Sequence, residues 1–307
     1  MSGKMGWSRH GGFVIAGVVV GMVLLQSWWM EVSRGEVRSG LQRATAVAAE
    51  TQRGNPLPSL DVSDYDRLLH TYVTDHGWVD YAGLARERGE LNRFLEESGK
   101  ISPDEFRNKE DRLAFWINAY NAFTVADVLD MVYGKHQSVR DVSGFFDGRR
   151  HLVAGEQLTL DEIEKRGRDL HDPRIHFALV CASTSCPTLQ RFAYTRDKLN
   201  SQLDQAAREF LADPNRGLRY DAQKNELYVS PIFKWYAGDF TRTWTGAGSV
   251  WASVRATVSG GDLLNFIARY APPEVARQIQ EHLPVVHYLD YDWSLNALDT
   301  HSPGTKP

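Results

Sequence analysis

The sequence lacks the motifs of several common enzyme classes. None of the patterns Gly-x-Ser-x-Gly, His-Glu-x-x-His, Gly-x-x-x-x-Gly-Lys or Gly-x-Gly-x-x-Gly occurs among the 307 residues. These patterns build serine nucleophile elbows, zinc protease sites and the phosphate-binding loops of nucleotide enzymes. Their absence disfavours nucleotide chemistry and zinc proteolysis.

A surplus of basic residues is also lacking. The chain has 35 Lys and Arg against 39 Asp and Glu, and the two signs are interleaved along it. A domain that binds nucleic acid needs a basic patch or stripe, so we expect no nucleic-acid partner. The 42% of hydrophobic residues is ample for a buried core.

Long apolar runs are confined to the N-terminus. Lys4 and Arg9 precede residues 11–25, which carry no charge, and Trp28 and Trp29 follow. Extended to Trp29, the run reaches the length of about 17–20 residues that a helix needs to span a bilayer. We predict an uncleaved signal anchor over residues 1–30 that crosses the cytoplasmic (inner) membrane once, with the globular domain on the periplasmic, extracytoplasmic side. A cleaved signal peptide is the alternative.

The remaining chain divides into three predicted parts. Residues 31–59 are rich in Arg, Glu, Ser and Gly and are predicted to form a stalk or linker, helical over about 37–51. The globular domain is predicted over residues 60–298, followed by a polar tail at 299–307. Residues 242–261, rich in Gly and Trp, read as a long loop or lid.

Hydrophobic spacing predicts that the domain begins with helices. They fall at residues 65–74, around Leu84 to Leu95, and at 110–132, which is apolar on all sides and therefore buried. Segments typical of strands come later, at 151–154, 175–181, 226–229 and 285–289. Helices are predicted between and after them at 160–167, 198–212, 263–270 and 273–281. This order predicts an α+β fold, with a helical N-terminal part and a small antiparallel sheet.

Six blocks, in the same order, resemble the domain of unknown function 547 (DUF547) family. They are Gly-Trp-Val-Asp-Tyr at 77–81, Ala-Phe-Trp-Ile-Asn-Ala-Tyr-Asn-Ala-Phe at 114–123, Leu-Asp-Glu-Ile-Glu at 160–164, residues 176–187, Ser-Pro-Ile-Phe-Lys-Trp-Tyr at 230–236 with Asp239 and Phe240, and Tyr-Asp-Trp-Ser-Leu-Asn at 291–296. The resemblance covers about residues 61–297. Members of the family occur in bacterial envelope proteins and in larger plant and animal proteins, and the resemblance implies no established reaction. The chain departs from the family pattern by its longer loop at 244–261.

Both cysteines of the chain lie in one of these blocks. Residues 175–181 are predicted to be a strand, with His176 and Cys181 on opposite faces, and Cys186 lies in a turn before Pro187 and a predicted helix. A helix N-terminus would lower the pKa of Cys186. Four interpretations stay open: a structural disulfide, a nucleophilic or redox thiol with His176 as base, a metal site in which His151 joins His176 and the two cysteines, and two inert thiols. The spacing of a metal motif is poor, so we predict neither a metal nor another cofactor.

Further candidates come from helices and loops near these residues. Asn118 and Asn121 lie one turn apart on the buried helix, where their amides either tie the helix to neighbouring backbone or line a cleft. Trp235, Tyr236 and Asp239 are predicted to form an aromatic wall with a capping carboxylate, or a platform for a peptide or glycan ligand.

A buried helix followed by a strand with histidine resembles part of the layout of transglutaminase-like and papain-like proteins. Those folds place a cysteine at the helix start, where this chain has Arg112, Leu113, Ala114 and Phe115. The similarity therefore concerns the fold alone.

Two functions compete at this stage. The first is a membrane-anchored binding or scaffolding module of the envelope, with a structural cysteine pair and a peptide or glycan ligand. The alternative is a thiol-dependent hydrolase or acyltransferase, in which Cys186 is the nucleophile, with Cys181 as a second candidate, His176 is the base, and Asn118 or Glu164 orients it. The sequence predicts no particular oligomeric state.

Overall fold

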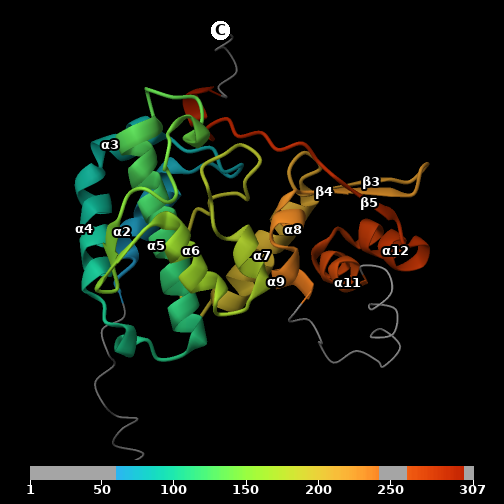
Figure 1. The fold of residues 1–307 in the computed structure, drawn as a ribbon, viewed down its shortest axis with the longest axis horizontal. Coiled ribbons are helices and arrows are strands. Elements are labelled where there is room, and N and C mark those ends of the chain that lie inside the picture. Colours follow the sequence, from blue (N-terminus) through green and yellow to red (C-terminus); the bar gives the residue numbers. More distant parts are fainter. Residues whose placement is uncertain (1–59, 242–260, 301–307) are drawn as a thin grey trace, which may run out of the picture. The chain divides into compact units, whose positions relative to one another are not determined.

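The computed structural model describes residues 60–241 and 261–300, and its first half is helical. Figure 1 shows helix α5 beside α4 and α6, the two helices that contact it most closely along the chain. The helices of this part are α2 (Ser63–Tyr72), α3 (Tyr81–Arg86), α4 (Arg88–Lys100), α5 (Lys109–Asp127) and α6 (Leu160–Arg168), with short helical turns η1 (Pro103–Glu105), η2 (Val128–Val132) and η3 (Val139–Asp141).

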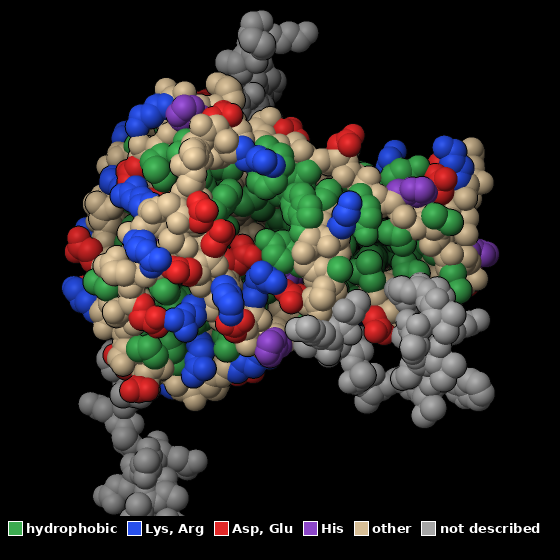
Figure 2. All heavy atoms as spheres, viewed as in Figure 1, with side chains coloured by type: hydrophobic (Ala, Val, Ile, Leu, Met, Phe, Trp, Pro, Cys, Tyr) green, Lys and Arg blue, Asp and Glu red, His purple; other side chains and the backbone are tan. Residues whose placement is uncertain are grey.

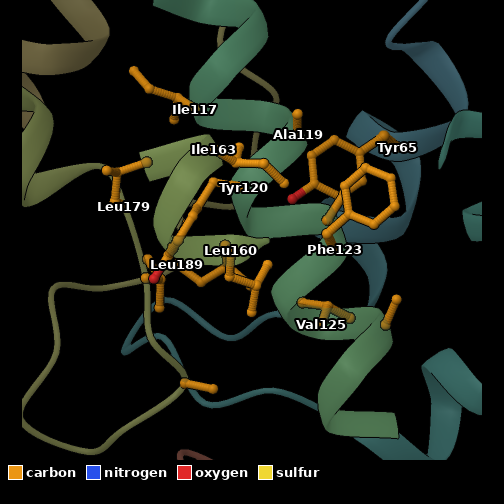
Figure 3. Packing of buried hydrophobic residues seen from close by; sticks show 14 of the residues in the cluster. Tyr65, Ile117, Ala119, Tyr120, Phe123, Val125, Leu160, Ile163, Leu179 and Leu189 are labelled. Atoms are coloured by element: carbon orange, nitrogen blue, oxygen red, sulfur yellow. The ribbon is translucent and has the colours of Figure 1, made fainter. Parts of the chain in front are cut away.

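Helix α5 is the centre of the larger hydrophobic core. The side chain of Asn108 caps it by accepting a hydrogen bond from Asp111 N (2.9 Å), and residues 113–127 are all buried. Figure 3 shows Tyr120 on the side of Ile163 and Leu160 of α6, and Phe123 on the side of Tyr65. Together with the π-turn η2, α5 confirms the predicted buried helix at 110–132.

The strands form two small sheets instead of one. Strands β1 (His151–Val153) and β2 (Glu156–Leu158) make an antiparallel hairpin, whose turn places Ala154 and Gly155 at φ 49° and 75°, as a tight hairpin requires. Strands β3 (Leu218–Asp221), β4 (Glu226–Val229) and β5 (Val285–Tyr288) form the second sheet. The α+β class is confirmed.

The prediction of an antiparallel sheet is wrong for one pair of strands. Strand β3 pairs with β4 antiparallel, but β5 pairs with β4 in parallel. The reason is the connection: helices α11 (Gly261–Tyr270) and α12 (Pro273–His282) lie between β4 and β5 in sequence, and a crossover of this length lets β5 run in the same direction as β4.

A second hydrophobic cluster is built around the ring of Phe177. The helices α7 (Leu199–Ala212), α8 (Ile232–Trp235), α9 (Ala237–Thr241) and α11 contribute to it. Four phenylalanine rings, of Phe210, Phe233, Phe240 and Phe266, lie with centroids 5.4–6.0 Å from that of Phe177. Because Phe177 follows His176 directly, this cluster fixes the histidine at its edge.

The predicted strand at 175–181 is wrong. Residues Pro173–Phe177 form a 3₁₀ helix, η4, which Asp172 caps by accepting a hydrogen bond from Arg174 N (3.1 Å). Proline at the first helical position and an aspartate before it favour a helical start. A short apolar run buried on all sides has no periodicity that separates strand from helix, so the hydrophobic pattern misleads here.

The predicted anchor at 1–30, the stalk at 31–59, the loop at 242–260 and the tail beyond residue 300 lie outside the described residues. In the part of the chain that the structure describes, no helix has the length and apolar character needed to cross a membrane. The last element of the described residues is the 3₁₀ turn η5 (Leu298–Thr300). The domain boundaries stay predictions.

Candidate thiol site

A cavity of about 180 Å³ brings together side chains from most of the domain's length. Around α8, on the face shown in Figure 2, hydrophobic side chains gather, whereas charged side chains of both signs cover the helical part. The cavity is lined by Tyr120 of α5, Phe146, Asp161 and Glu164 of α6, His176 of η4, Leu179, Cys181, Cys186, Pro187, Ile232, Trp235, Tyr236, Tyr291 and Trp293. Both thiols and the histidine of the sequence analysis therefore face one small space.

The two cysteines are free thiols in close contact. Their Sγ atoms lie 3.0 Å apart, and Cys181 N donates a hydrogen bond to Cys186 Sγ (3.0 Å). On its other side, Cys181 Sγ lies 3.1 Å from Ser183 Oγ and 3.4 Å from the hydroxyl of Tyr291. Since Ser183 donates to the Tyr291 oxygen (3.1 Å), the Tyr291 proton points to the sulfur of Cys181.

These contacts and the burial of the pair shift the pKa values of the two thiols in opposite directions. The hydrogen bond with Cys186 lowers the pKa of Cys181 most, and the hydroxyl groups of Ser183 and Tyr291 add to this effect, although burial opposes it. Burial, and the neighbouring charge that develops on Cys181, raise the pKa of Cys186 well above the ordinary thiol value. Cys181 is half-buried and Cys186 is buried. The thiolate, which is the reactive form, therefore belongs to Cys181.

The loop that carries the thiols is held from two sides. On one side, the Asn121 amide donates to Ala178 O (2.9 Å) and accepts from Val180 N (2.9 Å). On the other, Thr184 N donates to Ser294 O (2.8 Å). The loop has no regular secondary structure of its own, and helix α5 and the C-terminal segment fix it in place.

His176 is held by a carboxylate and two aromatic rings. Its Nε2 lies 2.9 Å from Asp239 Oδ2, its ring stacks on that of Tyr236 at 4.1 Å, and the Phe240 ring lies 5.2 Å away. Burial lowers the pKa of His176 below its ordinary value of 6.5, although Asp239 opposes this. The imidazole is therefore neutral at neutral pH and oriented by Asp239.

Asp239 is itself fixed as an anion. The hydrogen bond with His176 and the ion pair with Arg168 Nε (2.9 Å) lower the pKa of this carboxyl group. Arg168 lies on α6 and its guanidinium also covers the Tyr236 ring at 4.6 Å. The short helix α9 is thereby tied to α6 through the residue that orients His176.

Comparison with known proteins gives a family without an assigned reaction. The sequence model of the family described as "Protein of unknown function, DUF547" matches residues 103–211. This segment belongs to the DUF547 family. Neither a curated protein nor a solved structure matches the chain.

The DUF547 segment contains only part of the site. It holds α5, α6, His176 and both cysteines, whereas Asp239, Tyr236 and Tyr291 follow it in sequence. The carboxylate that orients the histidine and the hydroxyl that contacts Cys181 are therefore supplied by the chain beyond the matched DUF547 residues.

Asn118 and Asn121 have structural partners in the DUF547 segment. Asn118 donates to Tyr194 O (2.8 Å) and accepts from Tyr194 N (2.9 Å), and it borders a different cavity. Asn121 holds the thiol loop as described above. Each amide therefore ties α5 to backbone, and neither lines the thiol cavity.

Glu164 lines the cavity but does not orient His176. Burial raises its pKa, an effect that a hydrogen bond from Tyr236 and the charge of Arg168 oppose, and its carboxylate lies 3.6 Å from Arg168. The predicted role of orienting carboxylate falls to Asp239, which the sequence analysis placed among ligand-binding residues. Trp235 and Tyr236 line the cavity as an aromatic wall.

Cys186 does not lie at a helix N-terminus, contrary to the prediction. In the described stretch from Pro187 to Lys198 there is no helix, so no helix dipole acts on Cys186. His151, the additional metal ligand considered from sequence, lies against Asp127 (2.9 Å) and the Phe123 ring. Within residues 60–241 and 261–300, no group of three or more His, Cys, Asp or Glu is arranged to hold a metal ion.

Sequence reasoning missed three residues of the site. Tyr120, Ser183 and Tyr291 all lie in the blocks that resemble DUF547, but no spacing rule connects them to the thiols. Trp293 is half-buried and stacks on Trp235 at the cavity. The sequence does offer one indication of them, because each lies in a block that resembles DUF547, as His176 and the cysteines do.

Proposed function

We propose that this domain is a thiol-dependent hydrolase or acyltransferase, in which Cys181 is the nucleophile, His176 the general base and acid, and Asp239 the residue that orients His176. One observation carries the proposal: a single cavity contains a hydrogen-bonded thiol of lowered pKa and a buried histidine paired with a carboxylate. A nucleophile, a base and an orienting group define this reaction class. The nucleophile is reassigned from Cys186 to Cys181.

The chemistry follows from which atoms are already engaged. His176 uses Nε2 for Asp239, and no described residue bonds Nδ1, so Nδ1 is the ring nitrogen left to take the proton of a thiol in the same cavity. The sulfur then attacks an acyl carbon, a C–S bond forms, and the carbonyl electron pair moves to oxygen. When the tetrahedral intermediate collapses, the bond to the leaving group breaks and the imidazolium gives it the proton. Water or another acceptor, deprotonated by Nδ1, releases the acyl group from the thioester.

The experiment uses an activated acyl ester, p-nitrophenyl acetate, and a set of peptide amides with the full chain. Cys181→Ser is expected to abolish the burst of p-nitrophenol that reports thioester formation, and His176→Ala is expected to slow it. His136, an exposed histidine away from the cavity, provides the matched control His136→Ala, which keeps the burst. An undiminished burst in Cys181→Ser would refute the assignment.

A binding module is the second candidate, favoured by the aromatic wall. The rings of Trp235, Tyr291 and Trp293 lie with centroids 4.7–5.9 Å apart, and Trp235 is 48% exposed. Such a surface suits stacking against a glycan or a peptide side chain. If this is the function, quenching of tryptophan fluorescence by a peptidoglycan fragment survives in Cys181→Ser and is lost in Trp235→Ala.

We also propose that the domain works outside the cytoplasm, attached to the inner membrane by residues 1–30. The support is the uncharged run at 11–25 behind Lys4 and Arg9, which has the pattern of a signal anchor. Fusion of alkaline phosphatase after residue 300 tests it, because that enzyme is active only after export. An inactive fusion, or a domain recovered without membranes, would contradict the proposal.

A further inference from the structure

We propose that Cys181 and Cys186 form a reversible redox modification site, in which a hydroperoxide oxidises Cys181 and Cys186 resolves the product to an intramolecular disulfide. The proposal rests on the contact between the two sulfurs and on their unequal access to the cavity. Its consequence for activity rests on the proposed function, but the modification itself does not.

The first support is the geometry of the pair. The two Sγ atoms lie 3.0 Å apart, and the backbone N–H of Cys181 donates to the sulfur of Cys186. A disulfide needs the sulfurs to approach to about 2.05 Å, so a displacement of about 1 Å completes the bond. Thr184 and Ser185 hold the intervening turn to the C-terminal segment, which keeps both sulfurs at this distance.

The second support is that the two thiols differ in exposure. Both line the cavity, but Cys181 is half-buried, while Cys186 is 4% exposed and packed in the core. A cavity of about 180 Å³ has room for a hydroperoxide, because a water molecule occupies about 30 Å³. An oxidant in the cavity therefore meets Cys181 first.

The third support is the pair of hydroxyl groups beside Cys181. Ser183 Oγ and the Tyr291 hydroxyl lie 3.1 and 3.4 Å from its sulfur, where they stabilise a thiolate. An accessible thiolate beside a second cysteine is the usual arrangement of redox-sensitive sites. The Tyr291 hydroxyl also has a hydrogen bond with Cys186, but burial and the contact with Cys181 outweigh it there, so the net stabilisation favours the sulfur of Cys181.

The reaction balances in two steps. The Cys181 thiolate attacks hydrogen peroxide, the O–O bond breaks, and Cys181 sulfenic acid and hydroxide form. The Cys186 sulfur then attacks the sulfenic sulfur, the S–O bond breaks, and the hydroxyl leaves with the Cys186 proton as water. Two electrons pass from the cysteine pair to the peroxide, and a dithiol reductant returns them. While the disulfide persists, Cys181 cannot attack an acyl carbon.

The test is the intact mass of the full chain, first reduced, then exposed to one equivalent of hydrogen peroxide and alkylated with iodoacetamide. Wild type is expected to lose two hydrogen atoms and take up no carbamidomethyl group, and dithiothreitol is expected to restore both alkylation sites. Cys186→Ser is expected to stop at the sulfenic acid, detected as a dimedone adduct on Cys181, and Cys186→Ala repeats this without a hydroxyl. Cys181→Ser is expected to stay unoxidised.

Three results would overturn the proposal: a Cys181 sulfenic or sulfinic acid with Cys186 still alkylated in wild type, oxidation of Cys186 in Cys181→Ser at the wild-type rate, or a disulfide that resists dithiothreitol in the folded protein. The last result would indicate a permanent structural bond. Since the readout is mass, a disulfide that forms in a protein without acyl transfer would contradict only the proposed function. Acyl transfer without the disulfide would contradict only this inference.

Discussion

Two hydroxyl groups beside Cys181 can be removed with little change in packing, and the expected change in thiol pKa follows from their arrangement. Ser183 donates to Tyr291, and Tyr291 points its proton at the Cys181 sulfur, 3.4 Å away. In Tyr291→Phe the ring still packs on Trp235 and Trp293, whereas the Ser183 hydroxyl is free to turn to the sulfur at 3.1 Å. In Ser183→Ala, Tyr291 remains as a donor.

The size of the pKa shift of Cys181 depends on whether a hydrogen bond to its sulfur is lost or replaced. A hydrogen bond contributes about 0.5–1.5 kcal/mol, and somewhat more to an ion, and one pKa unit corresponds to about 1.4 kcal/mol. Each single variant keeps one donor, so we expect the pKa of Cys181 to rise by no more than about half a unit. The double variant keeps neither, and we expect a rise of about one unit or more, exceeding the sum of the singles.

The assay is the rate of iodoacetamide labelling of Cys181 against pH. In the double variant the sigmoidal profile is expected to move to higher pH, with labelling about tenfold slower on its acid side and unchanged on its alkaline plateau. Tyr288, an exposed tyrosine of β5 (44% exposed), provides the control Tyr288→Phe, which leaves the profile in place. A double variant with the wild-type profile would refute this account of the thiolate. So would pKa shifts of the two single variants that add up to the shift of the double variant.

The remaining predictions concern the histidine and the asparagines. Asp239→Asn and His176→Ala are expected to slow acyl transfer by about 10²–10⁴-fold, with His136→Ala unchanged, in a stopped-flow measurement of the p-nitrophenol burst; a loss below threefold would contradict the role of the pair. Because burial lowers the pKa of His176, the unfolded chain binds more protons below about pH 6.5, so the free energy of unfolding falls as the pH drops from there towards the folded-state pKa. In His176→Gln, the free energy of unfolding measured with urea is expected to change less with pH in that window. An unchanged pH dependence would show that His176 does not cause it. Asn121→Ala and Asn118→Ala each leave two backbone groups without a partner and are expected to lower the free energy of unfolding by about 2–4 kcal/mol, but only Asn121→Ala slows thiol labelling; equal labelling in both would show that the Asn121 contact does not position the thiol.

Local patterns in the sequence predict the helical framework well. The 110–132 segment is apolar on every side, and α5 is buried along nearly its whole length. Ser102 and Thr159 are each followed three residues later by a glutamate, a spacing that favours a capping box, and both capping boxes are present. These features depend on residues a few positions apart, so the sequence carries them directly.

The pairings within the site depend on contacts that no local pattern encodes. His176 and Asp239 are 63 residues apart and meet because α9 is tied to α6 through Arg168. Cys181 meets Tyr291 across 110 residues. The choice between the two cysteines also reverses, because it rests on the contacts of Cys181 with Cys186, Ser183 and Tyr291 and not on a helix start. The sequence therefore predicts the participants of the site better than their roles.

The most direct test of the account is which sulfur reacts first. The full chain, reduced and folded, is treated at neutral pH with less than one equivalent of iodoacetamide, digested, and the alkylated cysteine is identified by mass spectrometry. The account predicts carbamidomethylation at Cys181, with Cys186 modified at least about tenfold less, since the pKa of one thiol is lowered and that of the other is raised. Preferential modification of Cys186, or equal modification of both, would contradict the assignment of Cys181 as the reactive thiol of this domain.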